Sequence, residues 1–218
     1  SLYHKAQEKF IRNREIKIDR FEQTIESYRR FDARNQLPES PILFVGSSSI
    51  VFWETANSFP GYPITNRGFG GASLPEVIHY YDDVIKKHNP SMMVVYCDID
   101  VENGKSPEFS VNAFKELINR VEQDFDDIPI LLMSMKPTLI DDLLGADVRK
   151  NKMITNQQLI EYSESKSNLH YVDITSPMMD ESGKLKSEIF LEDGMHLNQH
   201  GYTFWDPVMK AAIDRVRK

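Results

Sequence analysis

Short apolar runs that alternate with helical patterns are the feature that most constrains the fold of this chain. After Pro38, runs rich in branched residues recur along the sequence at 42–45, 64–66, 92–96, 130–133 and 170–174. Continuous apolar runs of this length are typical of strands buried on both faces of a parallel sheet. We therefore predict one three-layer α/β domain over residues 39–218, and the 40% hydrophobic content is enough for its core.

Helical periodicity fills the segments between these runs. In the clearest segment, apolar residues at helical spacing share one face: Leu74, Val77, Ile78, Tyr81, Val84 and Ile85. The preceding Ser73-Leu-Pro-Glu76 is typical of a capping box. A second helix is predicted to begin at Ser106-Pro107, and the last to run from about Tyr202 to Val216. Strands and helices that alternate in this way predict parallel pairing of the strands.

The first 38 residues differ in charge from the rest of the chain. They hold nine Lys or Arg against six Asp or Glu, although the whole chain has a formal net charge of −7. Apolar residues at spacings of three and four predict one long helix with a single stripe: Ile11, Ile18, Phe21, Ile25 and Tyr28. We predict that residues 1–38 form a helical extension packed on the chain's own domain. A coiled-coil dimer is the alternative, but Arg14 interrupts one of its few heptads.

Charge and composition exclude several classes of protein. A net acidic chain lacks the basic surface that neutralises nucleic acid phosphates, so we expect no nucleic acid partner. The apolar runs are far shorter than the roughly 18 residues of a membrane span. The single Cys97 excludes internal disulfides and multi-cysteine metal sites. We expect a soluble protein, either cytoplasmic or, if a signal peptide preceded Ser1, periplasmic or extracellular, and its oligomeric state stays open.

Candidate site residues follow the carboxyl ends of the predicted strands, where open parallel sheets bind ligands. The first strand ends in Gly46-Ser47-Ser48-Ser49 and runs into a helical pattern. A glycine permits a tight turn, and Ser48 at the helix start would expose its hydroxyl and its backbone N–H at the strand tip. A plain helix N-cap is the commoner role for such a serine, so this motif alone favours the cap.

Two further motifs supply groups that could act together with the Ser48 hydroxyl. The second strand ends in a loop that holds Gly68, Gly70 and Gly71, where backbone N–H groups can approach a ligand. The loop lacks the spacing of a dinucleotide-binding motif. Near the C-terminus, Asp193 lies three residues before His196, so it can orient an imidazole that takes a proton from a serine. Together the motifs provide a nucleophile, a base, its orienter and oxyanion donors.

With these motifs the sequence resembles the SGNH (GDSL-type) hydrolases, in the branch whose first motif is Gly-Ser-Ser-Ser-Ile. The resemblance spans about residues 25–215 and includes Phe-Val-Gly-Ser-Ser-Ser-Ile, Asn-Arg-Gly-Phe-Gly-Gly, Gly-Lys-Ser-Pro-Glu and Asp-Gly-Met-His-Leu-Asn in this order. It implies a flavodoxin-like fold with five parallel strands in the order 2-1-3-4-5. It also implies a Ser48 nucleophile, a His196 base, an Asp193 orienter, oxyanion donors at Ser48 and Gly71, and no metal or organic cofactor.

The third motif of the family departs from its pattern here. The family sequence Gly-x-Asn-Asp supplies an asparagine that donates to the oxyanion, whereas this chain is one residue shorter, lacks the glycine and has Ile99 at the asparagine position. Isoleucine donates no hydrogen bond, and loss of one such donor typically lowers kcat by about 10² to 10³. Asn103 is a poor replacement because it lies four residues further along. Ile99 therefore predicts a weakened oxyanion hole.

A metal site is the alternative for the same segment, because Asp98, Asp100 and Glu102 carry alternating carboxylates. These side chains need not converge, and no histidine lies nearby, so we expect no metal.

The expected function is that of a serine esterase. The chain would hydrolyse small acyl esters, such as acetyl groups on a carbohydrate, through an acyl-enzyme formed on Ser48. The alternative is a degenerate member of the same fold that binds an ester or glycan without hydrolysing it, and Ile99 is the residue that favours this alternative.

Overall fold

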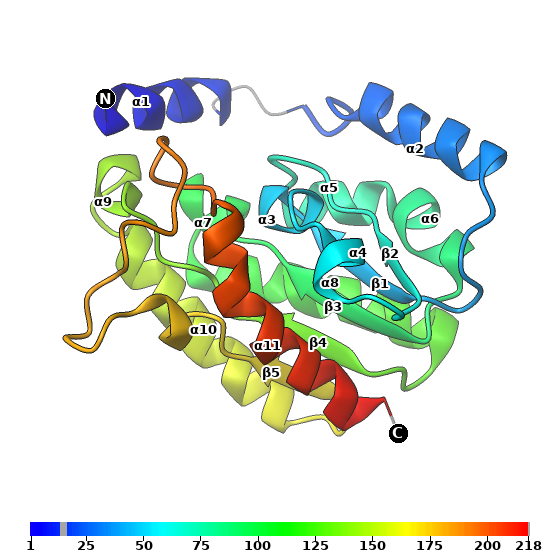
Figure 1. Cartoon of the computed structure of the whole chain (residues 1–218). Coiled ribbons are helices and arrows are strands. Elements are labelled where there is room, and N and C mark those ends of the chain that lie inside the picture. Colours follow the sequence, from blue (N-terminus) through cyan, green and yellow to red (C-terminus); the bar gives the residue numbers. More distant parts are fainter. Residues whose placement is uncertain (14–16, 218) are drawn as a thin grey trace.

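A parallel sheet forms the centre of the molecule (Figure 1). The computed structural model describes residues 1–13 and 17–217. Its strands are β1 (Ile42–Gly46), β2 (Ile64–Asn66), β3 (Met92–Tyr96), β4 (Ile130–Met133) and β5 (Leu169–Val172). They are all parallel, in the order β2-β1-β3-β4-β5, and pair for example at Val45 with Val95 and at Val95 with Leu132. The predicted fold class is confirmed.

Helices connect the strands and cover both faces of the sheet. They are α1 (Leu2–Asn13), α2 (Glu22–Arg34), α3 (Ser48–Val51), α4 (Thr55–Ser58), α5 (Leu74–His79), α6 (Tyr81–Val84), η1 (Lys86–His88), α7 (Ile99–Glu102), α8 (Pro107–Phe125), α9 (Asp141–Leu144), α10 (Val148–Glu164), η2 (Ser176–Met178) and α11 (Gln199–Val216). Among the described residues, no helix has the length and apolar character that a membrane span requires.

Side chains that alternate along the strands divide the core into two apolar layers. Val45 and Val95 pack with residues of α5, α6, α8 and α10 on one face of the sheet. Phe44 and Val94 pack with residues of α3 and α11 on the other face. The strands β1, β3 and β4 are buried along their whole length, so their sequences are continuous apolar runs rather than alternating ones. The outer strands β2 and β5 are partly exposed and include polar residues.

The prediction of one long N-terminal helix is wrong. The chain forms α1 and α2, with a turn before α2 in which Ile18 is 47% exposed, so the predicted apolar stripe is broken there. The turn brings Phe21 edge-on against Phe69, at 5.1 Å between ring centroids, and Ile25 is fully buried in the core. The side chain of Ile11 and all of Arg14 lie outside the described residues.

The helix predicted over 74–85 is likewise two helices, α5 and α6, separated at Tyr80. The predicted capping box at its start is confirmed. The Ser73 hydroxyl accepts a hydrogen bond from the Glu76 backbone N–H at 3.4 Å, and the Glu76 carboxylate accepts one from the Ser73 N–H at 3.1 Å. The box fixes the point at which the glycine loop after β2 ends.

Candidate active site

The turn after β1 positions three consecutive serines differently. Gly46 has φ +140°, and a Cβ there would lie 1.8 Å from the Tyr96 carbonyl oxygen, so the turn requires glycine. Ser47, which precedes α3, and Ser49 are both buried. The Ser49 hydroxyl accepts a hydrogen bond from Lys136. Ser48, the first residue of α3, is half-buried. Of the three hydroxyl groups, that of Ser48 faces the histidine described next.

Ser48, His196 and Asp193 form one hydrogen-bonded series. The His196 Nε2 atom lies 3.1 Å from the Ser48 hydroxyl oxygen, and the Nδ1 atom is bonded to the Asp193 carboxylate. The same carboxylate accepts backbone N–H bonds from Met195 at 2.9 Å and from His196 at 3.0 Å. An Asp193 acceptor at Nδ1 favours the tautomer that carries its proton there, which leaves Nε2 free to accept the serine proton.

The charge of Asp193 is stabilised by these bonds. Burial opposes ionisation, but the hydrogen bond from the His196 ring and the backbone N–H groups of His196 and Met195 outweigh it, so the pKa of Asp193 is well below its usual range. Gly194, between the acid and the base, has φ +66° and allows the tight turn. Asp193 is therefore a carboxylate across the neutral pH range, as the orientation of an imidazole requires.

The glycine loop after β2 lies beside Ser48. A Cβ on Gly70 would be 3.9 Å from the Ser48 Cβ, and Gly71 has φ +81°. Among the hydrogen bonds of the described residues, the backbone N–H groups of Ser48 and Gly71 donate to no protein acceptor. Such free N–H groups at the start of a helix and in a glycine loop are the kind of donors that stabilise an oxyanion.

Ile99 belongs to the apolar core rather than to the rim of the site. It begins α7, is 3% exposed and packs in the same apolar layer as Val95 and Phe69. A side chain in this position contributes packing to the core and no hydrogen-bond donor.

The carboxylates around Ile99 are each bonded within the protein, and Asp98 and Glu102 both lie near the Lys152 ammonium, at 3.8 and 3.0 Å. Asp98 accepts a bond from the Tyr96 hydroxyl, Asp100 from the Leu74 backbone N–H, and Glu102 from Lys152. Burial raises the pKa of Asp100 to about 6, and the nearby Glu76 adds to this shift although the Leu74 N–H opposes it. Within the described ranges, no group of three or more His, Cys, Asp or Glu residues could hold a metal ion.

A buried ionic cluster below the site was missed by the sequence analysis. The Lys136 ammonium donates to the Ser49 hydroxyl at 2.8 Å and lies 3.6 Å from the Asp98 carboxylate. The Lys152 ammonium bonds to Glu102 at 3.0 Å and to Asp141 at 2.9 Å. Both lysines are 2% exposed. The position of Lys136, three residues after β4 at the ligand-binding edge of the sheet, was the available signal for it.

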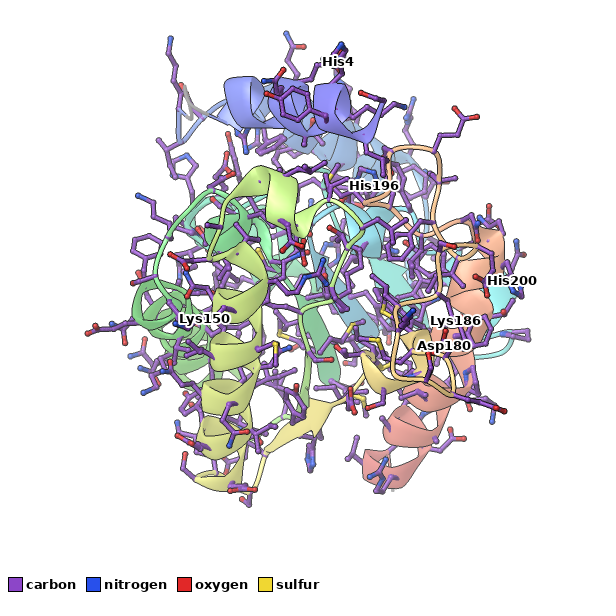
Figure 2. All side chains as sticks on the ribbon, turned by 90° about the vertical axis from the view of Figure 1, so that its left-hand side faces the viewer. His4, Lys150, Asp180, Lys186, His196 and His200 are labelled. Atoms are coloured by element: carbon purple, nitrogen blue, oxygen red, sulfur yellow. The ribbon has the colours of Figure 1, made fainter. Side chains whose placement is uncertain are left out.

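The surroundings of His196 are apolar on two sides. The ring of Phe52, a residue that is 53% exposed, lies edge-on to the His196 ring at 5.5 Å between centroids. On the other side, Met195 packs with Leu2 and Ala6 of α1. Figure 2 shows His196 beneath this N-terminal helix.

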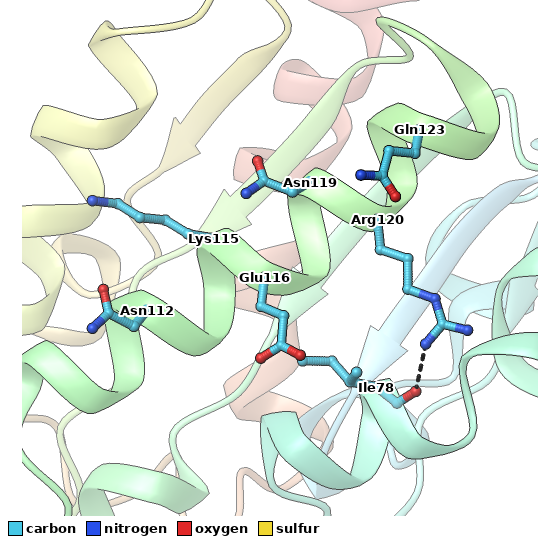
Figure 3. A pocket seen from close by; sticks show the side chains of 7 residues that line it. All are labelled: Ile78, Asn112, Lys115, Glu116, Asn119, Arg120 and Gln123. Atoms are coloured by element: carbon cyan, nitrogen blue, oxygen red, sulfur yellow. Dashed lines mark hydrogen bonds between the residues drawn. The ribbon is translucent and has the colours of Figure 1, made fainter.

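A surface pocket on α8 is separate from this site. It is lined by polar residues of α8 together with Ile78 of α5 (Figure 3). The Arg120 guanidinium donates to the Ile78 carbonyl oxygen at 3.2 Å and so links the two helices. The pocket shares no residue with the Ser48 series, and its Arg120 side chain serves to hold α5 in place.

Comparisons with known proteins agree on the fold. No protein-family model matches the sequence, and no curated protein sequence is similar to it. Solved structures are similar: a protein from Streptococcus pneumonia whose name refers to platelet activating factor has a TM-score of 0.79 at 21% identity, over 88% of this chain and 92% of that chain. A GDSL-like lipase from Bacteroides thetaiotaomicron has a TM-score of 0.75 at 18% identity, over 88% and 97% of the two chains.

A third similar structure is an acetylxylan esterase from Geobacillus stearothermophilus, with a TM-score of 0.63 at 13% identity, over 82% of this chain and 96% of that chain. The similarity in all three covers the sheet and the helical layers rather than a single motif. The chain therefore has the flavodoxin-like fold that these GDSL-like lipases and acetyl esterases share.

Proposed function

We propose that this protein is a serine esterase that hydrolyses small acyl esters, with acetylated carbohydrates as the substrate class. One observation carries the proposal: Ser48, His196 and Asp193 form a continuous hydrogen-bonded series at the carboxyl end of β1, with 3.1 Å between the His196 Nε2 atom and the Ser48 hydroxyl. A nucleophile, a base and an orienter in this geometry are what acyl transfer requires.

In the proposed reaction the Ser48 oxygen attacks the carbonyl carbon of the ester. His196 Nε2 takes the hydroxyl proton, and the carbonyl π electrons move to the oxygen, which the N–H groups of Ser48 and Gly71 stabilise. Collapse of this intermediate breaks the bond to the alcohol oxygen, which takes the proton from His196 and leaves. Water then attacks the acyl group on Ser48 in the same way, so the acid is released and the serine is restored.

The exposed ring beside His196 suits a substrate that has an apolar face. The exposed Phe52 ring gives an apolar face next to the base, on which a sugar ring or short chain can pack. Several proteins of the same fold are named as acetyl or acetylxylan esterases. Acetyl esters of carbohydrates are therefore the first substrates to examine.

A non-hydrolysing binding protein is the second candidate, and Ile99 is the observation that favours it. With Ile99 buried in the core, the oxyanion would have two backbone donors and no side-chain amide. Loss of one donor lowers kcat by about 10² to 10³, so hydrolysis that is slow but present fits the esterase proposal. Binding of an acetylated oligosaccharide without any hydrolysis fits the second candidate.

The deciding experiment compares serine variants. Hydrolysis of p-nitrophenyl acetate and labelling by a fluorophosphonate probe should disappear in Ser48→Ala and persist in Ser47→Ala, because the Ser47 hydroxyl is buried away from His196. His196→Ala should lower both rates strongly while the protein stays folded by circular dichroism. Labelling that is equal in wild type and Ser48→Ala, or lost in Ser47→Ala alone, would overturn the assignment.

A further inference from the structure

Arg20, in the turn before α2, contacts the glycine loop at Gly71, and Tyr28 of α2 contacts the same loop at the Gly68 carbonyl oxygen. The Arg20 guanidinium donates to both carboxylate oxygens of Glu76, at 2.7 and 2.9 Å, and to the Gly71 carbonyl oxygen at 2.7 Å. The Arg20 side chain is 23% exposed and that of Glu76 is 1% exposed. A partly buried fork of this kind is geometrically specific, because a planar guanidinium fixes the direction of each bond.

Glu76 connects this fork to the end of the glycine loop. Its Oε1 atom also accepts bonds from the backbone N–H and the hydroxyl of Ser73, at 3.1 and 2.9 Å. A buried carboxylate without a cation is costly, and Arg20 is the cation paired with Glu76 among the ion pairs of the described residues. One guanidinium therefore holds the loop at two points, Gly71 directly and Ser73 through Glu76.

Three side chains also bond to the backbone of the glycine loop: the Tyr28 hydroxyl donates to the Gly68 carbonyl, the Asn66 side chain accepts from the Gly68 N–H at 3.0 Å, and the Cys97 thiol donates to the Ala72 carbonyl at 3.3 Å. None of these three bonds is to Gly70 or Gly71. The described backbone bonds in this stretch are from Phe69 N–H to the Gly46 carbonyl at 2.9 Å and from Ala72 N–H to the Phe69 carbonyl at 3.1 Å. Gly70 and Gly71 are conformationally permissive residues, and Gly71 is held at φ +81°. The bond from Arg20 to the Gly71 carbonyl restrains the residue whose N–H has no acceptor among the described hydrogen bonds.

We propose that Arg20 is a positioning residue of the Ser48 site: the N-terminal extension supplies the guanidinium that fixes the glycine loop in the conformation that presents the Gly71 N–H. The expected effect on kcat rests on the proposed esterase function. The expected effect on the conformation of the glycine loop rests on the loop geometry alone. Phe21 contributes to the same contact, since its ring lies edge-on to Phe69 and under the Arg20 guanidinium at 4.5 Å.

The test compares Arg20→Ala with Arg29→Ala. Arg29 is the matched control because it belongs to the same extension and forms a two-pronged ion pair with Asp83, at 3.0 and 2.8 Å, that has no contact with the glycine loop. We expect Arg20→Ala to lower kcat for p-nitrophenyl acetate about tenfold to a hundredfold with less than about threefold change in KM, since a misplaced donor is lost mainly in the transition state. Arg29→Ala should change kcat less than about twofold.

Two additional variants and one activity-independent measurement complete the test. Arg20→Lys keeps the charge near Glu76 but cannot reach both acceptors in one plane, so it should restore only part of kcat. Methylguanidinium at millimolar concentration should raise kcat of Arg20→Ala and leave Arg29→Ala unchanged. Amide hydrogen exchange of residues 66–74 should become faster in Arg20→Ala and stay at the wild-type rate in Arg29→Ala.

The outcomes separate the two proposals. If wild type shows no Ser48-dependent hydrolysis, the esterase function fails, and the exchange rates of residues 66–74 still decide whether Arg20 holds the loop. If Arg20→Ala retains wild-type kcat below its melting temperature, or if both variants lose kcat and loop protection equally, Arg20 is a general stabilising residue and the positioning proposal is overturned.

Discussion

The Ile99 side chain packs in the core, although it stands where the third motif of the resembled family has its oxyanion asparagine. Ile99→Asn alone would bury an amide among apolar neighbours at the start of α7, which should lower the free energy of unfolding by about 1 to 3 kcal/mol with little gain in kcat. Insertion of a glycine before position 99 together with Ile99→Asn restores the length of the motif, and this variant should raise kcat by up to the tenfold to thousandfold range of one donor.

Urea unfolding and steady-state hydrolysis check both expectations. Equal kcat in the parent and the two-change variant, with both folded, would indicate that the oxyanion is already fully served by other groups. The weakened oxyanion hole would then no longer be an argument for slow turnover.

At the scale of the element, α10 is notable for its polar buried face. Lys152, Thr155 and Ser163 are buried along this helix, and Lys152 carries the cation of an ion cluster with Glu102 and Asp141. Burial alone would lower the pKa of Lys152, but the surrounding carboxylates outweigh it and raise the pKa. The helix is therefore held to α7 and α9 by buried charge pairs, in addition to its apolar packing on the sheet.

Removal of the Lys152 charge should be strongly destabilising. Lys152→Met leaves the Glu102 and Asp141 carboxylates buried without this cation, and loss of one partner of a buried pair typically lowers the free energy of unfolding by about 3 to 5 kcal/mol. Lys150→Met is the control in the same helix, because Lys150 is exposed (Figure 2), and it should change stability by less than about 0.5 kcal/mol. Similar urea midpoints for the two variants would contradict this account of α10.

The polar face of α10 also explains where sequence-based prediction stopped. The five strands were predicted with their positions nearly correct, and for β1, β3 and β4 the reason is that continuous burial produces continuous apolar runs. The α10 helix was not predicted, since Lys152 and Thr155 occupy its inner face and remove the apolar periodicity. The turn before α2 and the break at Tyr80 each place an aromatic ring against Phe69, and the contact of Phe21 with Phe69 joins residues that are far apart in the sequence.

The residues of the candidate site also differ in whether the sequence alone could predict them. Ser48, Asp193 and His196 could be proposed because a tight turn and a short acid-to-base spacing leave local marks in the sequence. The contacts of Lys136 with Ser49 and of Arg20 with Glu76 span 87 and 56 residues, so no local pattern indicates them. Their identification required the fold.

At the scale of the whole molecule, the N-terminal extension packs on both sides of the site. Ala6 of α1 is buried with Ile140 and with Met195, which is next to His196 in the sequence, and Ile25 of α2 is buried in the same apolar layer as Phe69 of the glycine loop. Figure 1 shows α1 and α2 along one end of the molecule, with α3 between them. We propose that residues 1–38 and 39–218 form one cooperative folding unit, not two separable ones.

Two truncations test this proposal. Removal of residues 1–13 uncovers the small cluster around Ile140 and should lower the free energy of unfolding by about 1 to 3 kcal/mol. The shortened protein should still fold and unfold in a single thermal transition. Removal of residues 1–34 also removes Ile25 and deprives the buried Arg67 of its Asp32 partner, so this chain should be aggregated or unfolded at 25 °C. Thermal melts and size-exclusion chromatography check both, and a soluble chain from residue 35 with the full-length Tm would contradict the single unit.

The contacts of α1 have a consequence for synthesis on the ribosome. Ala6 is translated before its partner Met195, which follows about 190 residues later in the sequence. At translation rates of about 5 to 20 residues per second, the apolar face of this helix waits on the order of 10 to 40 seconds before that partner exists. Contact of α1 with Met195 is thus a late step of maturation, and it coincides with the synthesis of His196.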